Sequence, residues 1–225
     1  MNSGRCGCGC NHGSDMSTQT KAEMRRRVRT ARVQLPAETT AERGEAMAAA
    51  LQRHIHPEAV VAGYVPMPGE PDVMPFLERH TARGGSVYLP IIPAAGRILG
   101  WAPWYPQTPM RRHHRMPISE PEHSCPLTPQ ELVARASTLT CPIPLVVLVP
   151  TLALDATGAR LGQGGGYYDT TTAQLNVILP QHPQLTCELI AVVHSEELMT
   201  AGAFPVEPHD LRATRAVTEC RIIDF

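Results

Sequence analysis

The sequence lacks any long apolar run and any excess of charge of one sign. No stretch approaches the roughly 18 apolar residues that a spanning helix needs, and the N-terminus has no apolar signal core. Lysine and arginine number 20 against 21 aspartates and glutamates, for a net charge of −1, which is unsuited to coating nucleic acid. We therefore expect a cytoplasmic protein that binds neither membranes nor nucleic acid. The Arg-rich segment 25–32 leaves organelle import as the less favoured alternative.

The seven cysteines lack the pairing pattern of a disulfide scaffold. Four of them are scattered along the chain, which predicts reduced thiols, at Cys125, Cys141, Cys187 and Cys220. The other three form Cys6-Gly-Cys8-Gly-Cys10, two residues before His12. Their intervals match no common tetrahedral zinc site, so a disordered Gly-rich extension over 1–16 is favoured over a metal-binding tail. The folded domain is then expected over 17–225.

Capping signals predict two helices at the start of this domain. The boxes are Thr20-x-x-Glu23 and Thr39-x-x-Glu42, each followed by apolar residues at helical spacing. Pro36 ends the first helix. Its polar face carries Lys21, Arg25, Arg29 and Arg32, either as a solvated basic face or, for Lys21 and Arg25, as a phosphate contact.

Strands and helices alternate after these two helices, and no internal repeat is present. Apolar runs predict strands over 60–65, 86–89, 98–101, 145–149, 188–193 and 216–218. Helices are expected over 72–83, 127–136 and 168–179, and Asp72 is the expected N-cap of the first of these. This order predicts a single three-layer α/β domain with a doubly wound, mostly parallel sheet flanked by helices. Within the Pro-rich segment 103–144, the run Arg111–Arg115 is interpreted as a solvated loop, with a phosphate or polyanion site as the alternative.

Residues Arg160 to Asp169, RLGQGGGYYD, form a glycine loop after the most apolar strand. No lysine follows the glycines, which excludes a P-loop, and Tyr167 stands where a dinucleotide fingerprint needs glycine. Glycines let backbone N–H groups turn inward around an anion, although they could merely make a tight connection. Glu70 also follows a predicted strand, so Glu70 and the loop are expected to face one crevice.

This loop resembles the signature of the 5-formyltetrahydrofolate cyclo-ligases, also called methenyltetrahydrofolate synthetases. The resemblance covers most of 20–220. It extends to the basic first helix, to Tyr64-Val65-Pro66-Met67-Pro68-Gly69-Glu70, to Ile118-Ser119-Glu120-Pro121, to Val149-Pro150-Thr151-Leu152-Ala153-Leu154-Asp155 and to Glu207-Pro208-His209-Asp210.

The resemblance implies an enzyme that uses ATP to convert 5-formyltetrahydrofolate to 5,10-methenyltetrahydrofolate, with phosphorylation of the formyl oxygen. We expect this enzyme to be a monomer. It implies catalytic roles for Glu70 and Arg160, and magnesium ligands at Asp169 and Asp210. The implied ATP-binding residues are Lys21, Arg25, Arg160, Leu161, Gly162, Gln163, Gly164, Gly165, Gly166, Tyr167 and Tyr168. The implied folate-binding residues are Val65, Glu70, Gln163, Gly164, Gly165, Gly166 and Tyr167.

Simpler roles remain open for several of these residues. Glu70 could be a solvated loop carboxylate, Asp169 a charge favoured by a helix dipole, and Asp210 a turn residue. Trp101 and Trp104 could flank the pterin but are more typical of packing. Thr170 and Thr214 stand where the family commonly has charged residues. A non-catalytic paralogue that binds folate or a nucleotide is therefore the alternative function, and a sugar-phosphate or acyl-transfer enzyme is a more remote one.

Overall fold

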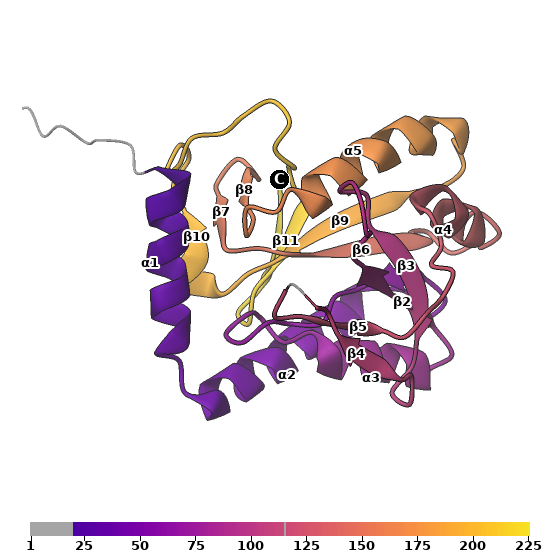
Figure 1. Ribbon diagram of the computed structural model, residues 1–225, viewed down its shortest axis with the longest axis horizontal. Helices are drawn as coiled ribbons and strands as arrows, with labels where there is room; N and C mark the ends of the chain where they lie inside the picture. The colour runs from indigo at the N-terminus through magenta and orange to yellow at the C-terminus, as the bar shows by residue number, and fades with distance from the viewer. Residues whose placement is uncertain (1–19, 115) are drawn as a thin grey trace, which may run out of the picture.

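The computed structural model describes residues 20–114 and 116–225, and a seven-stranded sheet forms its centre (Figure 1). The strand order is β12-β11-β9-β6-β1-β2-β3. The strands are β1 (Val60–Ala62), β2 (Ser86–Ile91), β3 (Gly100–Trp104), β6 (Leu145–Pro150), β9 (Cys187–Val192), β11 (Arg215–Val217) and β12 (Ile222–Asp224).

The inner strands of this sheet run parallel, and the two edge strands run antiparallel to their neighbours. β1 pairs in parallel with both β2 and β6, which makes it the point where the strand order reverses. Ligands of open α/β sheets bind beyond the carboxyl ends of the strands at such a point. The loops that follow β1 and β6 are therefore placed to build a site together.

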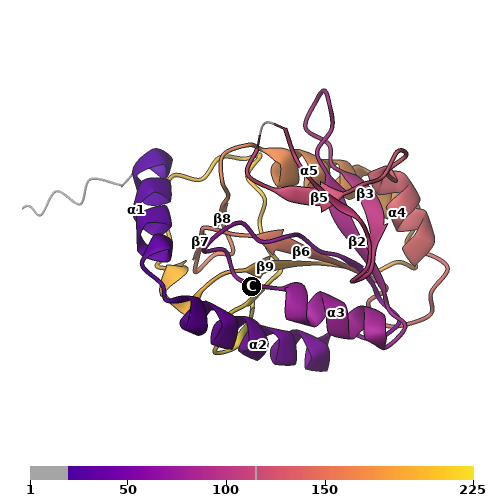
Figure 2. The same ribbon diagram turned by 60° about the horizontal axis from the view of Figure 1, so that its bottom comes forward.

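Helices cover both faces of the sheet, as Figure 2 shows. α2 (Ala37–His54) and α3 (Met74–Ala82) lie on one face, and α4 (Pro129–Ala136) and α5 (Tyr167–Ile178) lie on the other. Alternate residues of β6 point to opposite faces, so Val146 packs with the first pair of helices and Val147 with the second. The predicted doubly wound α/β fold is confirmed. No helix in the described part of the chain is long and apolar enough to cross a membrane.

α1 (Lys21–Val33) stands apart from these layers and packs on a small second sheet (Figure 1). That sheet has the order β10-β7-β8, formed by β10 (Leu198–Met199), β7 (Ala153–Asp155) and β8 (Arg160–Leu161). Met24 and Val28 of α1 are buried against Leu161 and Phe204. Because β7 follows directly from β6, this packing holds α1 beside the carboxyl end of the central sheet.

The remaining elements are short. β4 (Met110–Arg112) and β5 (Ser119–Pro121) form a two-stranded ribbon in the Pro-rich segment. Arg111 and Arg112, interpreted from sequence as part of a solvated loop, are exposed but lie in a strand. Two 3₁₀ turns, η1 (Leu179–Gln181) and η2 (Ser195–Glu197), follow α5 and β9. The sequence does not predict β4, β5, β7, β8, β10 and β12, each of two or three residues. β1 and β11 are equally short, but each coincides with or overlaps a predicted apolar run.

The helix starts were predicted with mixed success. The Thr20 capping box is confirmed, because Thr20 Oγ1 accepts from the Glu23 N–H at 3.3 Å and Glu23 returns a bond to the Thr20 N–H. The Thr39 box is wrong, because α2 already begins at Ala37, after Pro36 in an extended conformation. Asp72 is one residue early as the N-cap of α3, although its Oδ1 accepts from the Met74 N–H at 2.9 Å. The proposed tail over 1–16 lies outside the described residues.

Candidate active site

The glycine loop connects the small sheet to α5, and its backbone needs glycine at two positions. Gly164 has φ +102° and Gly166 has φ +72°, both in the left-handed region that other residues adopt at a cost. Gly166 is also the N-cap of α5 and supplies no side chain to cap it. The first N–H groups of α5 therefore remain open to an anion at the positive end of the helix dipole.

Two cavities adjoin this loop and share five residues of it as lining: Arg160, Gly162, Gly164, Gly166 and Asp169. The first, which we call the apolar cavity, is completed by Tyr64, Val65, Met67, Glu70, Pro90, Ile92, Leu99, Met116, Ile118, Ser119, Pro150, Gln163, Gly165, Tyr167 and Tyr168. The second, which we call the cationic cavity, is completed by Lys21, Arg25, Arg97, Leu161, Thr170, Glu207, His209 and Asp210. The glycine loop is thus a wall common to both.

Glu70 is a buried acidic side chain that lines the apolar cavity. It is only 5% exposed, so a solvated loop carboxylate does not describe it. Its Oε2 accepts from the Met67 N–H at 3.0 Å, and its Oε1 accepts from Gln163 Nε2 at 2.7 Å. A buried carboxylate is tolerated where such donors replace water. The turn at Gly69, with φ +81°, aims the side chain into the apolar cavity.

Tyr168 offers the apolar cavity an unused polar group. Its hydroxyl is buried and has no hydrogen-bond partner among the described residues. Burial raises the pKa of Tyr168, so the phenol stays protonated and can donate. A buried hydroxyl without a partner is unfavourable unless a ligand or water supplies one.

Arg160 is buried where the two cavities meet. Its Nη2 donates to the Pro150 carbonyl at 2.7 Å, and its Nη1 lies 3.5 Å from Asp169 Oδ1. Burial lowers the pKa of Arg160, whereas the Asp169 carboxylate acts in the opposite direction. A Cβ on Gly162 would lie 2.6 Å from the guanidinium nitrogens, so glycine there leaves Arg160 its place.

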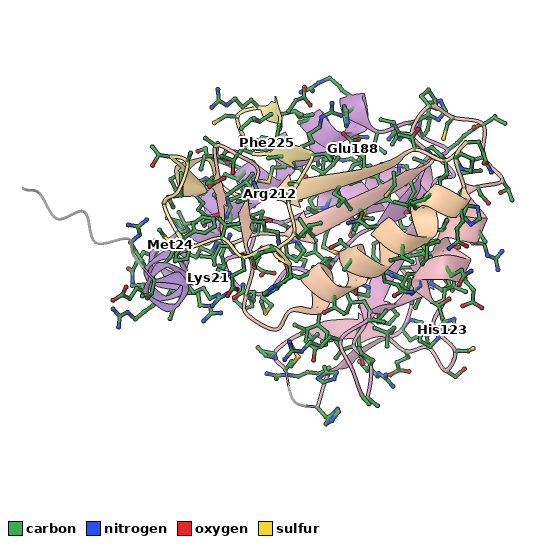
Figure 3. All side chains as sticks on the ribbon, turned by 90° about the horizontal axis from the view of Figure 1, so that it is seen from above. Lys21, Met24, His123, Glu188, Arg212 and Phe225 are labelled. Carbon is green, nitrogen blue, oxygen red and sulfur yellow. The ribbon has the colours of Figure 1, made fainter. Side chains whose placement is uncertain are left out.

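The cationic cavity collects positive side chains from three segments. Lys21, the single lysine of the chain, lies at the start of α1 (Figure 3) and bonds Asp210 Oδ2 at 2.7 Å and Glu207 Oε2 at 2.9 Å. Arg25, one turn on, donates from Nε to the Gly162 carbonyl at 2.9 Å. Arg97, from the loop between β2 and β3, approaches Gly166.

The Lys21–Asp210 pair is held in its charged form. Burial opposes the charge of Lys21, but hydrogen bonds to Asp210 and Glu207 outweigh it and raise the pKa of Lys21. Burial likewise opposes the charge of Asp210, but Lys21 and the Glu207 N–H outweigh it and lower the pKa of Asp210. Both charges are therefore available near neutral pH.

The aspartates expected to bind magnesium face the same cavity. Asp169 Oδ1 accepts from the Leu211 N–H at 3.1 Å, and Asp210 Oδ2 accepts from Lys21 and the Glu207 N–H. The second oxygen of each carboxylate makes no hydrogen bond to the described residues. Free carboxylate oxygens suit a hard cation such as magnesium. Ligand atoms of Glu207, His209 and Asp210 also lie within 4.8 Å of one another.

Sequence reasoning missed several residues of the two cavities. Arg97 and Met116 belong to isolated loops, and no pattern in the sequence links them to the glycine motif. Conversely, Trp101 and Trp104 are buried in the cores on either side of the sheet and line neither cavity. Gln163, Gly165, Tyr167 and Tyr168 line the apolar rather than the cationic cavity.

Three other positions singled out in the sequence are Arg111, Thr170 and Thr214. Arg111, from the basic run, pairs with buried Glu120 across the β4–β5 ribbon, which is a structural role. Thr170 lines the cationic cavity. Thr214 lines neither cavity and donates to the Leu189 carbonyl at 3.1 Å.

The chain is similar in sequence to known enzymes over most of its length. The sequence profile of the 5-formyltetrahydrofolate cyclo-ligase family matches residues 17–219. A 5-formyltetrahydrofolate cyclo-ligase of Mycolicibacterium smegmatis is 31% identical over 210 residues, covering 92% of this chain and 97% of that protein. The Escherichia coli K12 protein of the same name is 28% identical over 167 residues, covering 73% of this chain and 80% of that protein.

Solved structures show the same fold. The Aquifex aeolicus 5,10-methenyltetrahydrofolate synthetase superposes with a TM-score of 0.67 at 22% identity, covering 91% of this chain and 92% of that one. The Mycoplasma pneumoniae 5,10-methenyltetrahydrofolate synthetase gives 0.63 at 16% identity, covering 89% and 99%. On the strength of the profile match over most of its length, the chain belongs to the 5-formyltetrahydrofolate cyclo-ligase family.

Proposed function

We propose that this chain uses ATP to close 5-formyltetrahydrofolate to 5,10-methenyltetrahydrofolate, with release of ADP and phosphate. Family membership supports the reaction. One observation supports placing this reaction at the two cavities. The glycine loop lines both of them, with a buried carboxylate in the apolar cavity and positive side chains in the cationic cavity. A folate in the apolar cavity and a triphosphate in the cationic one would meet across it.

The chemistry requires both reactants at one point. The formamide oxygen is a poor leaving group, so it first attacks the γ-phosphorus of ATP and ADP leaves. N10 of the folate then attacks the activated formyl carbon, the N10 proton is lost, and the C–O bond breaks to release phosphate. Catalysis of phosphoryl transfer rests mainly on positioning and on charge neutralisation.

The cationic cavity would bind the triphosphate. Lys21, Arg25, Arg97 and Arg160 supply positive charge, and the open N–H groups of the loop and of α5 supply donors. Arg160 lines both cavities, so it is placed to neutralise charge on the phosphoryl group in transit.

The apolar cavity would bind the folate. Val65, Tyr167 and neighbouring apolar residues offer flat surface for the pterin, and Glu70 offers carboxylate oxygens to its N–H groups. The Tyr168 hydroxyl, protonated and without a partner among the described residues, would donate to a substrate oxygen.

Asp169 and Asp210 would hold magnesium, each through the carboxylate oxygen that no described residue occupies. When bound, the ion would neutralise charge on the phosphate oxygens. Lys21 would then exchange part of its contact with Asp210 for a phosphate oxygen. We also propose that the enzyme acts as a monomer, because one chain supplies the lining of both cavities. A cytoplasmic location is part of the same proposal.

The test is a direct assay with purified protein, 5-formyltetrahydrofolate, ATP and magnesium. We expect the methenyl chromophore to appear, with one ADP released per product and no product when ATP is omitted. Tight folate binding without ADP release would instead identify a non-catalytic binding protein.

A further inference from the structure

Arg29 lines neither cavity, yet it makes the densest set of contacts to the glycine loop. From the exposed side of α1, its Nε donates to Gln163 Oε1 at 3.0 Å and its Nη2 donates to the same oxygen at 2.8 Å. Nη2 also donates to the Gln163 backbone carbonyl at 2.9 Å. The guanidinium thus hydrogen-bonds to both the backbone and the side chain of one loop residue.

These contacts fix which way the Gln163 amide faces. With Oε1 on the guanidinium, Nε2 points to Glu70 and donates to its Oε1 at 2.7 Å. The reversed amide would set an NH₂ group against an arginine and an oxygen against a carboxylate, two repulsive contacts in place of two attractive ones. Only one orientation satisfies both neighbours.

We propose that Arg29 is a positioning residue that acts through the Gln163 amide to orient the Glu70 carboxylate for the folate substrate. The proposal rests on the proposed function, in which Glu70 faces 5-formyltetrahydrofolate. With Met67 holding the other oxygen, the relay gives each Glu70 oxygen one fixed donor and leaves its remaining acceptor capacity to the ligand. The substrate then meets a carboxylate already in its binding orientation, which lowers the entropic cost of binding.

The test compares steady-state constants of four single variants. Arg29→Met and Gln163→Leu should each raise the KM for 5-formyltetrahydrofolate by roughly tenfold, in line with the loss of a charge-assisted hydrogen bond. The KM for ATP and the melting temperature should change little. Arg26→Met, an exposed arginine on the same helix with no role in either cavity, should behave as wild type.

The variant Gln163→Glu distinguishes two roles for Gln163: a relay that orients Glu70, or an anchor that only attaches the loop to α1. A glutamate keeps and strengthens the contact to Arg29 but places a second negative charge beside Glu70. The relay predicts a larger rise in folate KM than Gln163→Leu causes, whereas an anchor predicts near wild-type behaviour.

The double variant Arg29→Met/Gln163→Leu should have a folate KM no higher than that of the more impaired single variant, because both substitutions interrupt the same relay. Additive losses, or a folate KM unchanged in Arg29→Met, would overturn the proposal. If the wild-type protein forms product but the variants do not show these KM values, the relay is wrong and the proposed function stands. Absence of wild-type turnover would instead count against the proposed function.

Discussion

Glu70 is a charged group in an apolar setting, and its two donors determine what can replace it. The Met67 N–H and the Gln163 amide bind different carboxylate oxygens. Both neighbours therefore need an acceptor, and any side chain that offers only one leaves a donor facing another donor. Its place after a predicted strand and the family resemblance make Glu70 a candidate, whereas its burial and these two partners follow only from the tertiary structure.

Glu70→Gln should lower kcat/KM for 5-formyltetrahydrofolate by about a hundredfold, because the glutamine NH₂ would face one of the two donors and the charge toward the pterin is lost. Glu58→Gln, on an exposed turn, is the matched control and should have no effect. Folate kinetics and circular dichroism of both variants make the comparison. Wild-type kinetics in Glu70→Gln would contradict the assigned role.

Lys21→Met should change the kinetics toward ATP rather than toward 5-formyltetrahydrofolate. Removal of the ammonium leaves Asp210 and Glu207 without their shared cation and removes a phosphate contact, so the KM for ATP should rise by about tenfold or more. The KM for 5-formyltetrahydrofolate should stay near its wild-type value. Initial rates over a grid of both substrates separate these effects, and an equal rise in both constants would argue against the division into two cavities.

The glycine loop is an element whose function depends on its backbone. The motif itself was readable from sequence, because glycines with a preceding arginine and a following Tyr-Tyr-Asp form a distinctive string. The small sheet that precedes the loop could not be predicted from the sequence, because β7, β8 and β10 are only two or three residues long. Arg29 and Arg97 reach the loop only through the tertiary fold, so a reading of local pattern could not assign them to it.

Gly164→Ala should impair both stability and activity. Its φ of +102° disfavours any Cβ, at a cost of roughly 1–2 kcal/mol in unfolding free energy. Gly84→Ala is a matched control, since Gly84 has φ +88° and nothing within 4 Å of an added Cβ. Urea unfolding should show similar destabilisation in the two variants. Only Gly164→Ala should lose turnover, and equal activity in the two would contradict the role of the loop.

At the scale of the whole molecule, the reversal of strand order at β1 brings distant segments together. Glu70 follows β1, and the glycine loop follows β6 by way of β7 and β8. β1 and β6 are direct neighbours in the sheet. The alternation of strands and helices is sufficient to predict a doubly wound, mostly parallel sheet, although not its edge strand β12. It could not predict that α1 would leave the layers and close the site from the side, because its capping box and apolar spacing fit any surface helix.

Two buried histidines should make the stability of the fold pH-dependent. Burial lowers the pKa of His80 and of His194 below the ordinary 6.5, so at a given pH each is less protonated in the folded chain than in the unfolded chain. The unfolded chain binds those protons first, so their contribution is complete above pH 6.5 and is lost as the pH falls through the folded pKa values. Urea unfolding at pH 7.5, 6.5 and 5.5 should give a falling free energy. A constant or rising value would contradict this.

The central claim, transfer of phosphate across the glycine loop to the formyl oxygen, can be tested with one isotope. 5-Formyltetrahydrofolate labelled with ¹⁸O in the formyl group is incubated with the enzyme, ATP and magnesium, and the released phosphate is analysed by mass spectrometry. The account predicts one ¹⁸O atom in each phosphate, in step with methenyl product. Unlabelled phosphate, with the ¹⁸O in water, would contradict it.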